Sequence, residues 1–237
     1  MNKTSAGFTL VELMVALALG VLLSLAAVQL FATNQRTFTL QEVVSGLQED
    51  GQSVIRYLST DLRQAGRGAA LQGAIDGIVI SGAPVSVEGA LGANDELVIT
   101  YFGDRDCQGT VLAGEVEIIN RYFVDGTGDF SCSGNQTAGS VVLLPGVESF
   151  QVLYGIDGDA DGNLGVTQFI KANALGGDPV VAIRFAILLA SPQPISVQPS
   201  SQTYYVLDEA VVSPSDRLVR RVFTKTVQLR NFDWDGV

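Results

Sequence analysis

The one stretch of this chain whose residue types and spacing could form a ligand site is an acidic loop in the second half. It places side-chain oxygens at alternate positions, namely Asp157, Asp159, Asp161 and Asn163. Together with a glycine at the sixth position, Gly162, this reproduces the start of a calcium-binding loop. Three carboxylates this close repel one another, and a hard cation would relieve the repulsion. The twelfth position holds Gln168 instead of a bidentate Glu, so an acidic turn without metal is the alternative.

The rest of the chain shows little sign of a catalytic site. The sequence contains no histidine, which removes the usual general base and the commonest nitrogen ligand of metals. No pair of carboxylates is singled out by its spacing, and no nucleophile motif is present, so we do not expect an enzyme. The formal net charge of −11 would repel phosphate backbones, so nucleic-acid binding is not expected either.

A long apolar run near the N-terminus precedes the rest of the chain and would fix where that part lies relative to a membrane. No residue from Leu13 to Gln35 carries a charge, and most are Leu, Val, Ala or Met. About 20 such residues are enough for a helix to cross the hydrocarbon core of a bilayer. Glu12 stands near the start of this run, where a carboxylate is costly and usually has a partner. The alternative is that Glu12 lies at the level of the lipid headgroups and has no special role.

The residues around Glu12 resemble the signal of type IV pilins and pseudopilins. A short polar leader carries Lys3, and the sequence FTLVE from Phe8 to Glu12 leads into the apolar run. The resemblance implies that a membrane peptidase cleaves between Gly7 and Phe8 and N-methylates Phe8. It also implies a role for Glu12 in assembly, because its carboxylate would neutralise the terminal amine of a neighbouring subunit.

The leader also predicts the topology of the chain. It lacks the apolar core and the small-residue cleavage site of a secretory signal, so cleavage would leave the membrane anchor attached. Its positive charge favours the cytoplasm, which places the remainder in the periplasm. We expect a leader at 1–7, a transmembrane helix at 8–35, an amphipathic continuation at 36–66 and a periplasmic β-rich domain at 67–237.

Beyond Gln35 the helical pattern continues. Apolar residues recur at steps of three, four and seven, at Leu40, Val43, Val44, Leu47, Val54, Ile55, Leu58 and Leu62. Such a stripe is typical of an amphipathic helix that packs on a sheet. Gly46 and Gly51 weaken the pattern locally, and the glycines of 66–68 are the expected stop. We therefore expect one helix from Phe8 to about Gln64.

After this helix the apolar pattern has the period of strands. Clusters of Gly, Asn, Asp and Pro separate short apolar or alternating runs at Ile78–Ile80, Glu96–Phe102, Glu115–Val124, Ser140–Leu144, Ser149–Tyr154, Val180–Leu189, Thr203–Leu207 and Val222–Leu229. Strands that follow one long helix favour an α+β fold with an antiparallel sheet. One extended sheet and two small sheets are both compatible with this many strands.

The two cysteines, Cys107 and Cys132, are too few for a zinc site. In a periplasmic domain they would lie in an oxidising compartment, where pairing is favoured. We expect a disulfide between them, and two buried free thiols are the alternative.

Several segments of the body resemble PilW-like minor pilins, namely 61–66, 107–109, 144–148, 152–157, 181–184, 220–223 and 226–231. The resemblance implies a subunit that primes assembly of a type IV pilus or lies at its tip. The implied partners are other minor and major pilins, the prepilin peptidase and the inner membrane. A J-type minor pseudopilin of a type II secretion system and a membrane-anchored adhesin are the alternatives. Calcium is the only cofactor that the sequence suggests.

Overall fold

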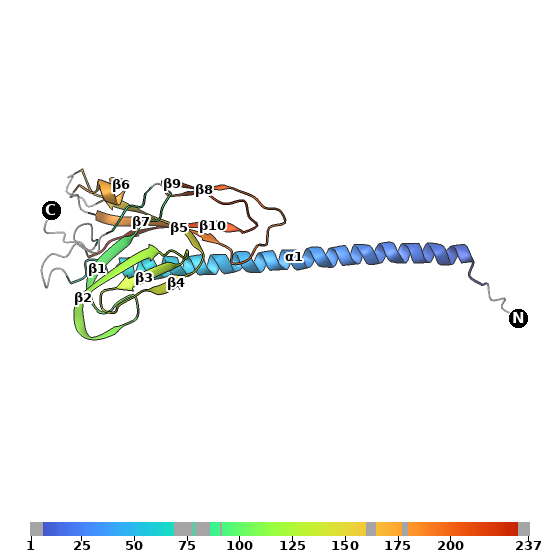
Figure 1. Cartoon of the computed structure of the whole chain (residues 1–237), viewed down its shortest axis with the longest axis horizontal. Coiled ribbons are helices and arrows are strands. Elements are labelled where there is room, and N and C mark those ends of the chain that lie inside the picture. Colours follow the sequence, from blue (N-terminus) through green and yellow to red (C-terminus); the bar gives the residue numbers. More distant parts are fainter. Residues whose placement is uncertain are drawn as a thin grey trace. The chain divides into compact units, whose positions relative to one another are not determined.

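The computed structural model describes residues 7–68, 78, 86–90, 92–159, 165–176 and 180–231. The chain divides into two compact units, Met1–Ser45 and Gly46–Val237. One helix, α1 (Leu10–Leu62), belongs to both units (Figure 1). The helix expected from Phe8 to about Gln64 is confirmed, since the observed ends differ from the expected ones by two residues each.

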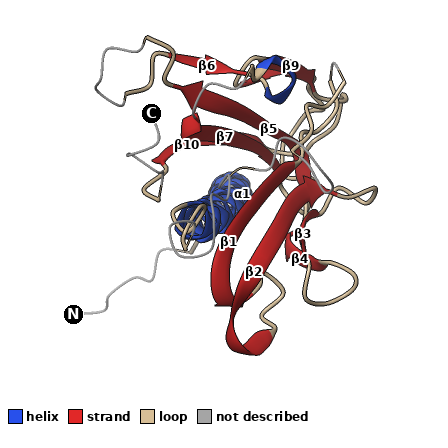
Figure 2. Ribbon diagram, turned by 90° about the vertical axis from the view of Figure 1, so that its left-hand side faces the viewer, coloured by secondary structure: helices blue, strands red, loops and turns tan. Residues whose placement is uncertain are grey.

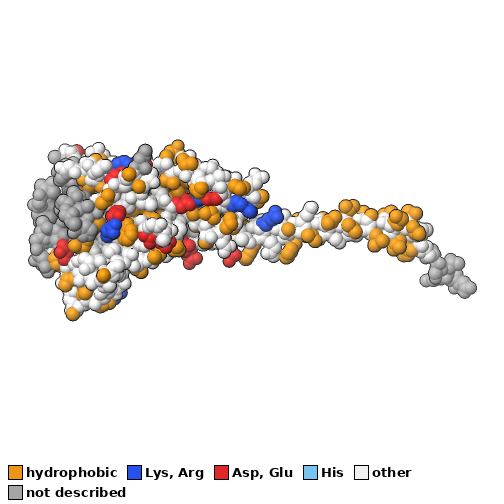
Figure 3. Space-filling model, in the orientation of Figure 1, with side chains coloured by type: hydrophobic (Ala, Val, Ile, Leu, Met, Phe, Trp, Pro, Cys, Tyr) orange, Lys and Arg blue, Asp and Glu red, His pale blue; other side chains and the backbone are white. Residues whose placement is uncertain are grey.

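The first unit is formed by the N-terminal part of α1 and the residues before it. This part of the helix is long and apolar enough to cross a membrane. Its most apolar stretch has no residue that is buried by the described part of the chain. Hydrophobic side chains cover its surface (Figure 3). A helix that exposes Leu, Val and Phe on every side needs lipid or other helices around it.

Ten strands are described in the second unit, and all their pairings are antiparallel. One sheet has the order β1-β2-β3-β4 and contains β1 (Leu97–Arg105), β2 (Val111–Val124), β3 (Phe130–Gly134) and β4 (Val141–Leu144). The other has the order β10-β7-β5-β6 and contains β5 (Val147–Ile156), β6 (Gln168–Ile170), β7 (Val180–Ala190) and β10 (Arg220–Gln228). A hairpin of β8 (Thr203–Val206) and β9 (Glu209–Val212) and the short 3-10 helix η1 (Ala172–Ala174) complete the unit.

The core of the second unit lies where the C-terminal part of α1 meets both four-stranded sheets (Figure 2). Leu58 and Leu62 of α1 are fully buried there. They share one apolar cluster with Tyr122 of the first sheet and with Phe150 and Phe185 of the second. From Leu47 to Leu62 the predicted apolar stripe is the face that α1 buries, whereas Val43 and Val44 are only partly buried and Leu40 is 42% exposed.

Gly51 lies at a close approach between α1 and the second sheet. A Cβ atom built on Gly51 would lie 2.5 Å from the ring of Phe223, which belongs to β10. A Cβ built on Gly46 would meet nothing within 4 Å. Gly51 therefore makes room for the Phe223 ring, and neither glycine interrupts the helix.

The α+β prediction is confirmed, with two separate four-stranded sheets and not one extended sheet. Three short strands, β3, β6 and β9, were not predicted. Of the run expected at Ile78–Ile80, only Ile78 lies among the described residues, and it forms a single bridge to Ile99. The expected stop of the helix is confirmed by the left-handed backbone of Gly66, with φ of 76°.

Candidate functional site

The helix of the first unit begins with a reciprocal cap. Glu12 Oε2 accepts hydrogen bonds from the backbone N–H and from the hydroxyl of Thr9, both at 3.0 Å. The N–H of Glu12 donates to Thr9 Oγ1 at 3.3 Å. This capping box satisfies N–H groups that the first turn of a helix leaves free. Glu12 thus has a partner in its own chain that was not predicted, although the spacing of Thr9 and Glu12 is the sequence signal for it.

Gly7 and Phe8 lie just before this cap, in exposed and non-helical backbone. Phe8 is 87% exposed. Lys3 and the rest of the first six residues lie outside the described residues. Because the Gly7–Phe8 bond is not held in the helix, its backbone is sterically accessible to a peptidase.

The predicted disulfide is present in the second unit. Cys107 and Cys132 are bonded, with their Cα atoms 6.3 Å apart. Cys107 follows β1 and Cys132 lies on β3, so the bond ties the connection between β1 and β2 to the third strand of the sheet. Tyr57 of α1 donates its hydroxyl hydrogen bond to the carbonyl of Cys107 at 3.1 Å, which attaches the same corner to the helix.

The acidic loop considered for calcium is only partly described. Asp157 and Asp159 directly follow β5, whereas Asp161 and Asn163 lie outside the described residues. Asp157 Oδ2 accepts a hydrogen bond from the backbone N–H of Gly165 at 3.3 Å. Calcium binding by this loop stays a prediction.

A buried carboxylate near the end of α1 was not predicted. Asp61 Oδ2 accepts hydrogen bonds from the hydroxyl of Tyr122 and from Asn120 Nδ2, the latter at 2.9 Å. Burial raises the pKa of Asp61, and these hydrogen bonds oppose part of the rise. The partners come from β2, about 60 residues further along the chain, so no local pattern could have revealed them.

A second acidic group surrounds Lys171. Its Nζ lies 2.7 Å from Glu88, 2.7 Å from Asp208 and 3.1 Å from Glu209. The three carboxylates are close enough to one another to hold a metal ion, but Lys171 already supplies a cation among them. Burial, with added repulsion from Glu88 and Asp208, raises the pKa of the nearby Asp95 to about 6.

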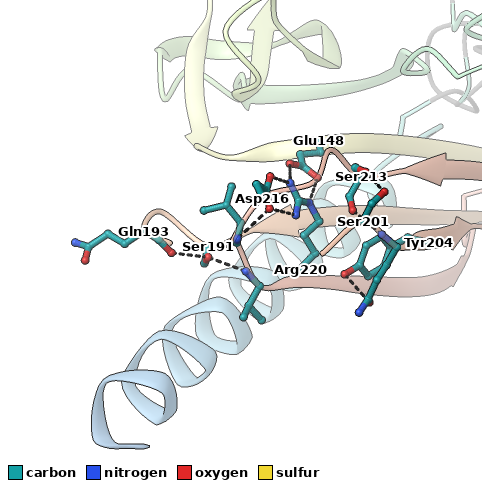
Figure 4. A network of polar contacts seen from close by, with 11 residues as sticks. Glu148, Ser191, Gln193, Ser201, Tyr204, Ser213, Asp216 and Arg220 are labelled. Carbon is teal, nitrogen blue, oxygen red and sulfur yellow. Dashed lines mark hydrogen bonds and ion pairs between the residues drawn. The ribbon is translucent and has the colours of Figure 1, made fainter. Parts of the chain in front are cut away.

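Arg220 joins three separate parts of the second unit (Figure 4). Its guanidinium pairs with both oxygens of Glu148, at 2.6 and 2.8 Å, and with both oxygens of Asp216, at 2.8 and 2.6 Å. Only 1% of the Arg220 side chain is exposed. Hydrogen bonding to Arg220 lowers the pKa of Asp216 to about 2. Arg220 and Glu148 belong to two of the segments that resemble minor pilins, so their pairing gives these segments a shared structural role.

Other segments of this set also contact one another. Asn231 Nδ2 donates to the carbonyls of Arg63 at 2.9 Å and Ala65 at 3.2 Å. The last described residue of the chain thus satisfies carbonyl groups just beyond the C-terminal end of α1. Arg184 Nε donates to Thr226 Oγ1 at 3.0 Å and links β7 to β10.

Two family models match the chain. A prokaryotic N-terminal methylation motif matches residues 2–28, and PilW, the type IV pilus-assembly protein W, matches residues 117–231. Together the two matches support a PilW-like type IV minor pilin. The first match covers the cleavage signal and most of the apolar run, and the second runs from β2 to Asn231.

The family of this minor pilin is structural and not enzymatic. The matches do not favour the pseudopilin or adhesin alternatives. The methylation motif and the apolar helix indicate a membrane anchor that carries a soluble domain.

Among solved structures, the minor pilin is similar to the Type IV-like pilin TTHA1219 from Thermus thermophilus. The two chains are 17% identical, with a TM-score of 0.48, and the alignment covers 78% of this chain and 96% of that one. No curated protein sequence matches this minor pilin.

Proposed function

We propose that this minor pilin is held in the inner membrane with its body in the periplasm, and then primes assembly of a type IV pilus or lies at its tip. Prepilin peptidase cleaves it between Gly7 and Phe8 and N-methylates Phe8. Its partners are other minor pilins and the major pilin. We assign it no catalytic role.

The N-terminal segment carries this proposal. The Gly7–Phe8 bond is exposed and precedes a helix that starts at Leu10. Among the described residues, none covers the most apolar stretch of that helix. A segment built in this way can be cut without disturbing the helix, stay in lipid and later exchange lipid for the helices of other subunits.

In the filament we propose that Glu12 pairs with the terminal amine of a neighbouring subunit. The capping box with Thr9 holds the Glu12 carboxylate near the start of the helix. After cleavage, the terminal amine of each subunit would be at the same end of the chain, on Phe8. Each charge would lower the cost of burying the other.

Mass spectrometry of purified filaments tests the proposal. We expect peptides of this chain that begin with N-methylated Phe8, at a small fraction of the major pilin, and a Gly7→Val variant that keeps Met1 and is missing from filaments. Gly20→Ala is the matched control, because a Cβ at this exposed helix position meets nothing within 4 Å. Filaments that contain the chain with Met1 intact, or co-purification with secretion pseudopilins in place of pilus subunits, would refute it.

A further inference from the structure

A pocket of about 570 Å³ lies in the second unit, between the C-terminal part of α1 and the end of β1. Its lining includes three of the chain's 14 cationic side chains, Arg56, Arg67 and Arg105. Pockets of a few hundred Å³ are large enough for a small ligand or for a few side chains of a partner.

In the part of the chain that the structure describes, two of these arginines have guanidinium groups without a partner. Arg56 and Arg105 are exposed, and neither forms an ion pair with any carboxylate among the described residues. Arg67 is already engaged, since its Nε donates to the carbonyl of Phe102 and its Nη2 to Glu115, each at 3.0 Å. A free guanidinium presents a planar set of donors that fits a carboxylate with two parallel hydrogen bonds.

The lining also contains three carboxylates, those of Asp61, Asp104 and Asp106. Asp61 is buried and turned to donors of β2. Asp106 is also buried, and its Oδ1 accepts from the backbone N–H groups of Gln108 and Thr110, at 3.1 and 3.0 Å. Asp104 is the exposed carboxylate of the lining. The three arginines and three aspartates of the lining therefore sum to no formal charge, and Arg56 and Arg105 are its two cations without an ion-pair partner among the described residues.

One wall of the pocket is a face of α1. Arg56, Thr60 and Gln64 follow one another at steps of four, and all three line the pocket. Eight residues of helix rise about 12 Å, the length of three to four residues of extended peptide. Tyr57, which is 40% exposed, adds an aromatic surface to the same wall.

We propose that this pocket receives an Asp or Glu side chain from an acidic segment of a neighbouring pilin subunit, and that Arg56 and Arg105 hold its carboxylate. The proposal rests on the proposed function, because assembly brings other subunits against this body. A peptide can follow the helical wall as well as bind the two arginines, whereas a free small carboxylate reaches the arginines alone. The complementary charge would favour the correct partner and its register.

Photo-cross-linking in cells that assemble pili tests the proposal. A benzoylphenylalanine placed at Thr60, on the wall of the pocket, should cross-link to another pilin through a peptide that contains Asp or Glu. The double variant Arg56→Gln, Arg105→Gln should lower the yield roughly tenfold or more, because two charge-assisted hydrogen-bonding groups are lost. Arg63→Gln is the matched control, since Arg63 is exposed directly after α1 and outside the pocket, and the yield should be unchanged.

The same cross-linker at Leu17, in the exposed apolar stretch, reports assembly independently of the pocket. Cross-links from Leu17 but not from Thr60 would overturn the pocket proposal and leave the proposed function standing. Loss of both would instead count against assembly itself. Equal yields from Thr60 in the wild type and the double variant would also overturn the proposal. So would binding of succinate to the detergent-solubilised full chain without any cross-linked pilin, because the ligand would then be a free carboxylate.

Discussion

Folding disfavours the charged form of the Asp95 carboxylate. It is 3% exposed, and it accepts hydrogen bonds from the backbone N–H groups of Gly89 and Val152, both at 2.8 Å. Even so, its pKa rises from 3.8 to about 6, because burial and the nearby charges of Glu88 and Asp208 outweigh those bonds. The folded chain therefore binds this proton more tightly than the unfolded chain does.

The sign of the pH dependence follows from this difference. The Asp95 contribution to stability is fully present below about pH 4 and is lost as the pH rises through about 6. Asp95→Asn removes this titration at the cost of one accepted hydrogen bond. We expect the wild type to exceed the variant in free energy of unfolding by more at pH 4 than at pH 7. Urea unfolding of a fragment that begins at Arg36 measures both, and a difference independent of pH would show that folding does not perturb Asp95.

Calcium binding by the acidic loop can be tested on the same fragment. Binding to the folded state alone raises stability as RT ln(1 + [L]/Kd), which is about 4 kcal/mol for millimolar calcium and micromolar affinity, so the melting temperature should rise by about 8 °C or more. Asp157→Asn should abolish the shift, whereas Glu42→Gln, which removes an exposed helical carboxylate, should preserve it. Identical melting curves with calcium and with chelator would leave the loop as an acidic turn.

At this scale the sequence predicts groups whose partners are implied by chemistry and misses those whose partners are set by the fold. Cys107 and Cys132 could be paired because the chain has two cysteines. Lys171 and the carboxylates around it come from three distant segments of the chain, at 88, 171 and 208–209, and only the fold brings them together. Neither charge nor spacing along the chain contains that information.

Among the elements, α1 depends on a glycine at its contact with β10. Gly51→Ala would drive a Cβ into the Phe223 ring, and we expect a loss of about 1–3 kcal/mol despite the better helix propensity of alanine. Gly46→Ala has free space at its Cβ and should gain up to about 1 kcal/mol. The two variants, compared by urea unfolding, should therefore change stability in opposite directions. A stabilising Gly51→Ala would mean that the Phe223 ring moves aside freely.

The disulfide is a second link between elements. It closes a loop with a sequence separation of 25 residues, for which chain-entropy estimates give roughly 3 kcal/mol of stabilisation. Cys107→Ala, Cys132→Ala should lower the free energy of unfolding by about that amount, and a reductant should lower the wild type to the level of the variant. A wild type unaffected by complete reduction would show that strand packing alone holds β3 in place.

The elements that the sequence predicts well are those with a long and regular period. The stripe of α1 extends over several turns, and the long strands alternate or are apolar throughout. β3 (FSCSG) was not predicted because it does not show the alternation of buried apolar and exposed polar residues. Phe130, Ser131 and Cys132 are all buried. The two sheets could not be told apart, because each strand pattern specifies a buried face but not which sheet it joins.

At the scale of the whole molecule, the two units serve different needs. The first exposes an apolar helix that is stable only in lipid or among other subunits, and the second has a complete core of its own. The apolar membrane segment was predictable, because a long run of residues without charge marks such a segment directly. Which neighbours the chain meets depends on surfaces such as the Arg56 pocket, which exist only after folding.

Glu12 connects the structure of one chain to assembly, and two explanations of it predict different results. Its carboxylate both caps its own helix through Thr9 and, as proposed, neutralises a neighbour's terminal amine. Glu12→Gln retains an acceptor for the capping box but removes the charge, whereas Thr9→Val removes the hydroxyl and keeps the charge. Glu12→Ala removes both.

The deciding measurement is co-purification of each variant with other pilins, normalised to its level in the membrane. If charge pairing is the role of Glu12, Glu12→Gln should be depleted as strongly as Glu12→Ala, and Thr9→Val should be recovered like the wild type. Breaking one side of a buried ion pair commonly costs about 3–5 kcal/mol, so depletion of tenfold or more is expected even after softening by water and headgroups. Recovery of Glu12→Gln at the wild-type level would contradict charge pairing and leave helix capping as the function of Glu12.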